Sequence, residues 1–171
     1  MTAAPEMDSR RTSSRRAPLD VESLYRATRD DVYAYVTSMV GVGAAADDVT
    51  SAVFERAFRR RARFDPRRGE PRAWIFTIAR NTALDELRRR ERHADPHADP
   101  PVAAEDPGRE LHLQVRDALA ALDPRQRELI VLKFHAGLTQ AEIGAVLGIS
   151  PTAAGTRLHR ALATLRRICD V

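Results

Sequence analysis

The sequence predicts an all-α protein in which two small helical domains are joined by a proline-rich linker. Apolar residues recur at helical spacing along both halves of the chain. No stretch shows the alternation of apolar and polar residues that marks a half-buried strand. Pro96, Pro100, Pro101 and Pro107 interrupt the middle of the chain, and a helix cannot continue through them.

The domain boundaries follow from these interruptions. We expect a disordered Arg/Ser-rich tail at 1–19, a three-to-four-helix bundle at 20–92, a flexible linker at 93–108 and a second domain at 109–171. Hydrophobic residues make up 43% and charged residues 30% of the chain, which is the balance of an ordinary globular protein.

The first half predicts three helices. Asp20 can cap a helix that ends at Gly41, and a second helix runs from about 45 to 63. The segment 64–71 (FDPRRGEP) favours turns, and Pro71 suits the first position of a third helix. The residues predicted to be buried are Leu24, Val32, Val36, Met39, Val40, Val49, Ala52, Val53, Ala57, Ile75, Ile78, Ala79 and Leu87.

The second half predicts further helices. One carries Leu111, Val115, Ala118, Leu119 and Leu122 on its apolar side. The next is capped by Asp123, has Gln126 in the third position of a capping box, and ends near Gly137. Its predicted core residues are Leu129, Ile130 and Leu132.

Two short helices near the C-terminus form the clearest motif. Residues 139–142 (TQAE) make a capping box, Gly148 ends the first helix, and Ser150 with Pro151 starts the second. Gly144 stands where the two helices must cross closely. The predicted inner residues are Ile143, Val146, Leu147, Ile149, Ala154, Leu158, Ala161, Leu162, Leu165 and Ile168.

This motif matches the DNA-binding helix-turn-helix, whose second helix enters the major groove. Short polar and methyl groups can read base edges there, and arginines can hold phosphates. The alternative is an ordinary corner of two helices in a bundle. The candidate DNA-binding residues of the motif are Thr139, Gln140, Pro151, Thr152, Ala153, Thr156, Arg157, His159 and Arg160.

Charge and cysteine usage narrow the class of protein. The net charge is only +4, but arginines cluster at 59–63, 67–72, 88–92 and 157–167, which indicates a polyanionic partner or solvated helix faces. Cys169 is the only cysteine, which excludes an internal disulfide and suits a reducing cytoplasm.

Several other classes of function find no support in the sequence. No apolar run approaches the roughly 20 residues that span a bilayer, and the first 18 residues lack the apolar stretch of a secretory signal. His93 and His97 lie among prolines without a nearby cysteine, so we expect no metal. We also expect no cofactor and no enzymatic activity, because no catalytic constellation is present.

Both halves resemble bacterial sigma factors of the extracytoplasmic-function subfamily. Region 2.2 of the family is similar to AADDVTSAVFERAFRR, and regions 2.3 and 2.4 are similar to EPRAWIFTIARNTALDELRRRERH. Region 4.1 is similar to LDPRQRELIVLKF, and region 4.2 to GLTQAEIGAVLGIS with TRLHRALATLRR. The residues that match the family motif of regions 2.3 and 2.4 are Trp74, Ile78, Ala79, Asn81, Asp85, Leu87 and Arg88. Ile75 replaces the leucine of that motif.

The resemblance implies that the first domain captures the minus-ten promoter element as it melts, while the second reads the minus-thirty-five element as duplex. Asn81 and the segment 64–71 would line a pocket for a flipped base. The structural alternatives are that Trp74 is a core residue and that the polar stripe of this helix only faces solvent. This polar stripe consists of Thr77, Asn81, Asp85 and Arg88. The implied minus-ten residues are Phe64, Arg67, Arg68, Arg72, Trp74, Thr77, Arg80, Asn81, Asp85 and Arg88.

The resemblance also implies partners. Core RNA polymerase is expected to bind through its clamp coiled coil and its flap, and an anti-sigma factor is expected to hold the protein inactive. Asp48 and Glu55, with exposed Phe54 and Phe58, would face the clamp, although acids at a helix start also have a structural reason. Gly155 departs from the family pattern, which often has Lys or Arg there.

Two rival functions remain open at this point. One is a stand-alone transcriptional regulator that binds operator DNA without polymerase and uses residues 1–90 for dimerisation or sensing. The other is an enzyme with an appended DNA-binding domain. A stand-alone regulator would bind duplex DNA tightly as a free protein. An enzyme would require a set of catalytic residues in the first domain, residues 20–92.

Overall fold

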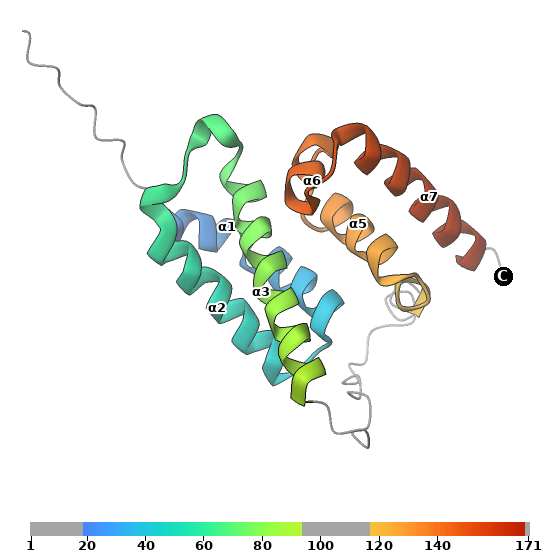
Figure 1. Ribbon diagram of the computed structural model, residues 1–171, viewed down its shortest axis with the longest axis horizontal. Helices are drawn as coiled ribbons and strands as arrows, with labels where there is room; N and C mark the ends of the chain where they lie inside the picture. The colour runs from blue at the N-terminus through green and yellow to red at the C-terminus, as the bar shows by residue number, and fades with distance from the viewer. Residues whose placement is uncertain (1–18, 94–116, 170–171) are drawn as a thin grey trace, which may run out of the picture.

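The computed structural model describes residues 19–93 and 117–169 and confirms the all-α class. The first range contains α1 (Val21–Val40), α2 (Ala44–Arg60) and α3 (Pro71–His93), with the short 3-10 helices η1 (Arg61–Arg63) and η2 (Pro66–Arg68) between α2 and α3. The second range begins with a helical turn at 117–120, followed by α5 (Pro124–Phe134), α6 (Gln140–Leu147) and α7 (Pro151–Cys169). Figure 1 shows the two groups of helices side by side.

Three of the predicted segments lie wholly or almost wholly outside the described residues. They are the N-terminal tail, the linker between the domains, and the helix that carries Leu111 and Val115. Only the end of that helix, at 117–120, is described, and Ala118 is buried there.

The predicted helix starts are largely confirmed. The Asp20 carboxylate accepts hydrogen bonds from the Ser23 hydroxyl at 2.6 Å and from the amides of Ser23 and Glu22 at 3.2 and 3.1 Å. The bond from the Ser23 hydroxyl, followed by that from the Ser23 amide, lowers the pKa of Asp20. The Asp123 carboxylate accepts from the Arg125 amide at 2.9 Å.

Two predicted details of these helices were wrong. Gln126 does not complete a capping box, because its side-chain amide donates to the Thr164 hydroxyl at 3.5 Å instead. The α-helical part of α2 ends at Arg60 rather than near residue 63, because residues 61–63 tighten into the 3-10 turn η1.

The core of the first domain consists of side chains packed between α1, α2 and α3. Tyr35 and Phe76 are fully buried and meet edge to face, with ring centroids 5.6 Å apart. Buried Thr28 and Thr82 satisfy their hydroxyls on the carbonyls of Leu24 and Ile78. Several residues predicted to be buried are only partly so: Met39, Ala52, Leu87, Leu119, Leu147, Ile149, Leu162, Leu165 and Ile168.

The helix-turn-helix of α6 and α7 has the predicted local structure. The Thr139 hydroxyl accepts from the Glu142 amide at 3.3 Å, while the Glu142 carboxylate accepts from the Thr139 amide at 2.7 Å. Gly148 ends α6 in the left-handed conformation with φ 68°, which favours glycine. The Ser150 hydroxyl then accepts from the Ala153 amide at 3.1 Å and starts α7.

Two helical glycines of this motif predict opposite effects on stability. A Cβ at Gly144 would lie 2.7 Å from the backbone oxygen of Ile149, so Gly144→Ala is expected to cost about 1–3 kcal/mol of unfolding free energy. A Cβ at Gly155 would meet only the end of the flexible Gln140 side chain, at 2.9 Å. Gly155→Ala is therefore expected to gain up to about 1 kcal/mol from helix propensity. Urea unfolding of both variants checks this, and a loss of equal size at both positions would contradict it.

The two domains pack directly against each other. Helix α1 lies against α5, and α3 lies against α6, so that one buried apolar cluster continues from the first domain into the second. The predicted minus-ten helix, α3, therefore contacts the first helix of the helix-turn-helix motif. We call this direct packing of the two domains the closed arrangement. It determines which of the predicted site residues are free to bind another molecule.

Candidate nucleic-acid interface

A cavity of about 200 Å³ lies beside the amino-terminal half of α3, where the flipped-base pocket was predicted. Phe64 and Trp74 form one wall and contact each other edge to face, with centroids 5.5 Å apart. Thr77 lines the cavity, but its hydroxyl donates to the Ala73 carbonyl. Ala145 of α6 closes another side, so the second domain partly covers the cavity in the closed arrangement.

Trp74 contacts both the core and the cavity. Its ring is half-buried and packs against the core, and it also lines this cavity. An aromatic face in a cavity of this kind can stack on an unpaired base.

Asn81 lies one turn beyond Thr77 and is not among the residues that line this cavity, and its place in a flipped-base pocket stays a prediction. It is exposed, and its side-chain amide makes no hydrogen bond within residues 19–93 and 117–169. An exposed mid-helix asparagine without a partner is an unusual choice for helix stability alone, and its amide can pair with a base edge.

Asp85, the next residue of the predicted polar stripe, has a structural partner. Its carboxylate accepts a hydrogen bond from Arg56 at 3.1 Å and lies 3.7 Å from Arg88. Arg56 also donates to the Thr82 hydroxyl, so this group ties α2 to α3. A minus-ten contact by Asp85 remains a prediction, whereas its contact with α2 is present in the closed arrangement.

The arginines predicted to hold minus-ten phosphates fall into two groups. Arg67, Arg68 and Arg88 are exposed. Arg72 instead pairs with Asp31 and donates to the carbonyl of Ala136 in the second domain.

Arg80, the other member of the second group, binds a largely buried carboxylate of the second domain. Its guanidinium donates to the Glu128 carboxylate at 2.9 Å, and the Tyr35 hydroxyl donates to the same oxygen at 2.8 Å. The Glu128 side chain is only 11% exposed. Burial and the nearby Glu128 carboxylate raise the pKa of Tyr35 well above its ordinary value, so the phenol stays a donor.

Sequence reasoning missed Glu128 and Tyr35 as interdomain residues. Each sits at a position that helical periodicity assigns to the core, since buried Val32 lies one turn from Tyr35 and buried Leu132 lies one turn from Glu128. The sequence did offer one signal: Glu128 is a charged residue at a core-facing position of its helix. A carboxylate removed from water needs a partner, which indicates a contact with another part of the chain.

Most residues predicted to read the minus-thirty-five element are exposed in the closed arrangement, at the start of α6 and along α7. Ala153 is half-buried. The Thr139 hydroxyl is engaged in the capping box, which leaves its methyl group as the part free for a base contact. Gly155 leaves room for the Gln140 side chain against α7, which is a structural reason for the departure from the family pattern.

The described residues contain no cluster of three or more His, Cys, Asp or Glu side chains that could hold a metal ion. Among the helices in these two ranges, none combines the length and the apolar character needed to cross a membrane.

The comparisons with known proteins decide the family. The family model for Sigma-70 region 2 matches residues 24–93, and the one for Sigma-70, region 4 matches residues 112–165. RNA polymerase sigma factor CarQ of Myxococcus xanthus is 39% identical over 86% of this chain and 87% of its own length. The chain belongs to the sigma-70 family.

This sigma factor is also similar to a protein named for the extracytoplasmic-function (ECF) subfamily. ECF RNA polymerase sigma factor BldN of Streptomyces coelicolor is 32% identical over 85% of this chain and 58% of its own length. RpoE of Bartonella quintana, solved in complex with the anti-sigma factor NepR, shares the fold with a TM-score of 0.77. It is 24% identical over 89% of this chain and 98% of that chain. Members of this family are non-catalytic initiation factors that direct RNA polymerase to promoters.

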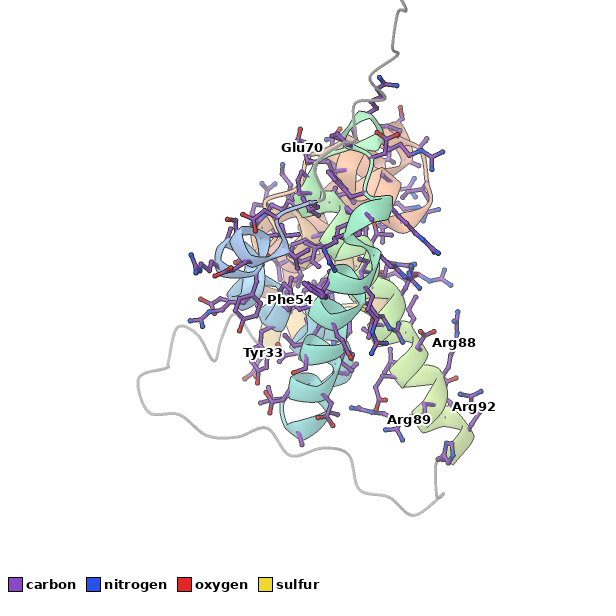
Figure 2. All side chains as sticks on the ribbon, turned by 90° about the vertical axis from the view of Figure 1, so that its left-hand side faces the viewer. Tyr33, Phe54, Glu70, Arg88, Arg89 and Arg92 are labelled. Carbon is purple, nitrogen blue, oxygen red and sulfur yellow. The ribbon has the colours of Figure 1, made fainter. Side chains whose placement is uncertain are left out.

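The surface of the sigma factor predicted to face the polymerase clamp lies on α2. Asp48, Glu55 and Phe58 are exposed, with Phe58 54% exposed and its ring covered on one side by the Arg61 guanidinium at 3.9 Å. Phe54 is not exposed as predicted, because its ring packs edge to face on Tyr25 at 4.8 Å. Figure 2 shows Phe54 on α2 between the helices, far from the arginines at the end of α3.

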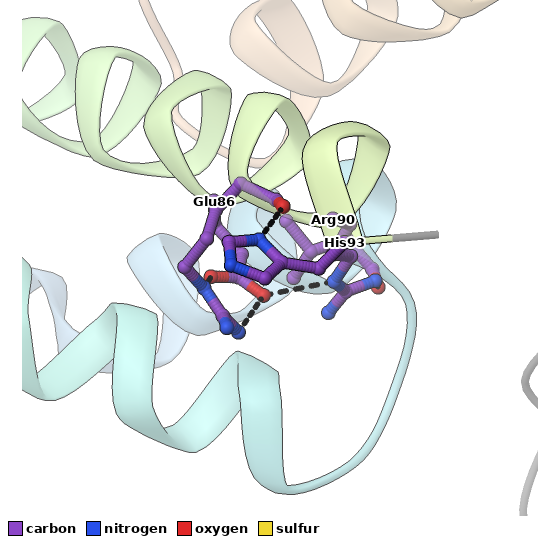
Figure 3. A network of polar contacts seen from close by, with 5 residues as sticks. Glu86, Arg90 and His93 are labelled. Carbon is purple, nitrogen blue, oxygen red and sulfur yellow. Dashed lines mark hydrogen bonds and ion pairs between the residues drawn. The ribbon is translucent and has the colours of Figure 1, made fainter. Parts of the chain in front are cut away.

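A carboxylate near the end of α3 stabilises the first domain of the sigma factor. Glu86 accepts hydrogen bonds from Arg89 at 2.8 and 3.0 Å and from Arg90 at 2.9 Å (Figure 3). The hydrogen bond from Arg89, followed by that from Arg90, lowers the pKa of Glu86 to about 2. Arg90 in turn donates to the Val40 carbonyl at 2.7 Å, which satisfies the end of α1, where the last turn has no basic residue of its own.

Replacement of Glu86 by glutamine is expected to cost about 1 kcal/mol of unfolding free energy at neutral pH. Because the folded-state pKa lies below the ordinary value of 4.5, the contribution of Glu86 is fully present above that pH and is lost as the pH falls through about 2. Urea unfolding of wild type and Glu86→Gln between pH 7 and pH 2 checks this.

The matched control is Glu22→Gln, which breaks a pair with Arg26 whose two side chains are both 73% exposed. Such an exposed pair contributes little, so the control is expected to behave as wild type. A gap between wild type and Glu86→Gln that stayed constant down to pH 2 would contradict the assignment.

Proposed function

We propose that this sigma factor recognises two promoter elements with two separate surfaces. The amino-terminal half of α3 and the segment 64–71 capture bases of the minus-ten element, and α7 reads the minus-thirty-five element in the major groove. We base this assignment on two exposed polar surfaces in one chain: Asn81 on α3, whose side chain has no partner in the described residues, and the first turns of α7.

The same proposal requires the two domains to separate. Arg72 and Arg80 are bound to Asp31, Glu128 and backbone carbonyls in the closed arrangement, and Ala145 lines the cavity beside Trp74. These groups cannot serve melted DNA until α6 and α5 move away from α3 and α1. The closed arrangement is therefore the resting state, and polymerase or promoter binding favours the open one.

We further propose core RNA polymerase and an anti-sigma factor as protein partners. The exposed acidic and aromatic residues of α2 are suited to a basic coiled coil such as the polymerase clamp. RpoE of Bartonella quintana was solved with an anti-sigma factor, and we extend that kind of regulation to this chain as a proposal. Since polymerase and promoter DNA lie in the bacterial cytoplasm, we place the protein there.

The Asp48 carboxylate gives the sharpest test of the clamp surface. Asp48→Lys reverses an exposed charge at a proposed contact and is expected to raise the Kd for core polymerase about tenfold or more. Fluorescence anisotropy with labelled sigma factor and purified core measures this Kd.

Asp47→Lys is the matched control, because Asp47 is also exposed and is the neighbour of Asp48 near the start of α2, close to the same end of the helix dipole. The control is expected to bind core polymerase nearly as wild type does. Equal weakening by both variants would show a general effect of charge and would contradict the assignment of this face.

A further inference from the structure

A second cavity, of about 400 Å³, lies at the boundary between the two domains, beside the first turn of α5. Of the residues predicted to bind the minus-ten element, only Arg80 lines this second cavity. Both domains form its wall. The lining residues are Arg80 from α3, with Arg125, Gln126, Glu128, Leu129, Leu147, Arg157 and Arg160 from the second domain.

The charges around this cavity do not balance. Glu128 is its only carboxylate, and that carboxylate already accepts from Arg80 and Tyr35. The guanidinium groups of Arg125, Arg157 and Arg160 make no hydrogen bond or ion pair within residues 19–93 and 117–169. Three uncompensated guanidiniums around one cavity produce a positive potential, which the amino-terminal end of the α5 dipole strengthens.

The chemistry of this wall favours one class of ligand. Guanidinium groups bind phosphate oxygens through paired hydrogen bonds, and three of them can neutralise an anion with several charges. The volume falls within the range of about 300–1,000 Å³ that is typical of small-molecule sites. Buried Leu129 and half-buried Leu147 supply an apolar side.

We propose that this cavity is a binding site for a small oligophosphate, either an inorganic polyphosphate or the phosphate chain of a nucleotide. Because its wall comes from both domains, the complete site exists only in the closed arrangement. An oligophosphate therefore binds the closed state preferentially and stabilises it by mass action. Its competition with promoter DNA for Arg157 and Arg160 rests on the proposed function, whereas binding itself does not.

Calorimetric titration of the full chain with inorganic tripolyphosphate tests the site. Arg125→Gln removes one guanidinium without touching a proposed promoter contact and is expected to raise the Kd about tenfold. Arg167→Gln is the matched control, because Arg167 is also exposed but lies near the far end of α7, away from the cavity wall. The control is expected to bind as wild type does.

A second experiment tests whether the oligophosphate favours the closed arrangement. A donor and an acceptor dye on Cys169 and on a Ser51→Cys substitution report the separation of the domains, since both positions are exposed. In an Arg72→Gln background, which loses the contact with the Ala136 carbonyl and so populates the open arrangement, tripolyphosphate is expected to raise energy transfer. The additional Arg125→Gln substitution is expected to abolish that rise. Titration with a nucleoside triphosphate separates the two sources, because a lower Kd than that of tripolyphosphate indicates that the base uses the leucine side.

Equal Kd values for Arg125→Gln and Arg167→Gln would overturn the proposal, since binding would then follow the overall charge. Unchanged energy transfer at saturating ligand would overturn the link to the closed state. Run-off transcription without the ligand is expected to be the same for Arg125→Gln and wild type. A chain that binds tripolyphosphate at this site but fails in transcription would refute the promoter assignment and leave the oligophosphate site standing.

Discussion

Glu128→Lys is expected to open the two domains of this sigma factor without unfolding either. The Glu128 side chain is 11% exposed, and its partners Tyr35 and Arg80 both belong to the other domain. Removal of one member of this ion pair leaves Arg80, whose side chain is 26% exposed, without its partner in a poorly hydrated site, which costs about 1–3 kcal/mol. In the open state Arg80 and Tyr35 regain contact with water. The substitution therefore destabilises the closed arrangement relative to the open one and leaves the stability of each domain unchanged.

Energy transfer between dyes on Cys169 and Ser51→Cys measures the opening, and the expected result is a marked fall in the free protein. Glu91→Lys is the matched control, because Glu91 is exposed on α3 and makes the same change of charge. The control is expected to keep wild-type energy transfer. If Glu128→Lys kept it too, the Glu128 contacts would not hold the domains together.

Asn81→Ala is expected to reduce promoter-dependent transcription about five- to a hundredfold. This range corresponds to the roughly 1–3 kcal/mol that a specific contact to a base edge contributes. The stability of the protein is expected to stay the same or rise slightly, since Asn81 is exposed, has no side-chain partner in the described residues, and has a lower helix propensity than alanine. A large functional loss with an intact fold is what separates a DNA contact from a structural residue.

Run-off transcription and urea unfolding of the same preparation measure the two quantities. Glu91→Ala, at another exposed position of α3, serves as the control and is expected to transcribe as wild type does. Wild-type transcription by Asn81→Ala would remove this residue from the minus-ten surface. A parallel loss of stability would show that its role is in the fold.

The local features of the structure were predictable because each depends on residues close together in sequence. The cap at Asp20, the capping box of Thr139 and Glu142, and the left-handed Gly148 all join groups within a few residues of one another. The helical class follows from the same short-range spacing. Gly144 was predictable as a close crossing because the turn after it is short.

The interdomain contacts could not be predicted in the same way. The bond between Tyr35 and Glu128 joins residues 93 positions apart, and the contact of Arg72 with Ala136 joins residues 64 apart. Helical spacing gives the face on which a residue lies, but not which helix that face meets. For this reason Arg72 and Arg80 were predicted as free phosphate contacts, and the structure shows them bound to the second domain.

Promoter-specific transcription by polymerase is the central claim, and a run-off assay tests it most directly. Purified chain and bacterial core RNA polymerase would be incubated with a template library of random upstream DNA. Discrete transcripts that require the chain, and whose start sites share a minus-ten and a minus-thirty-five sequence, are the predicted result. The absence of such transcripts, together with specific binding of a symmetric duplex site by the free chain, would contradict the account.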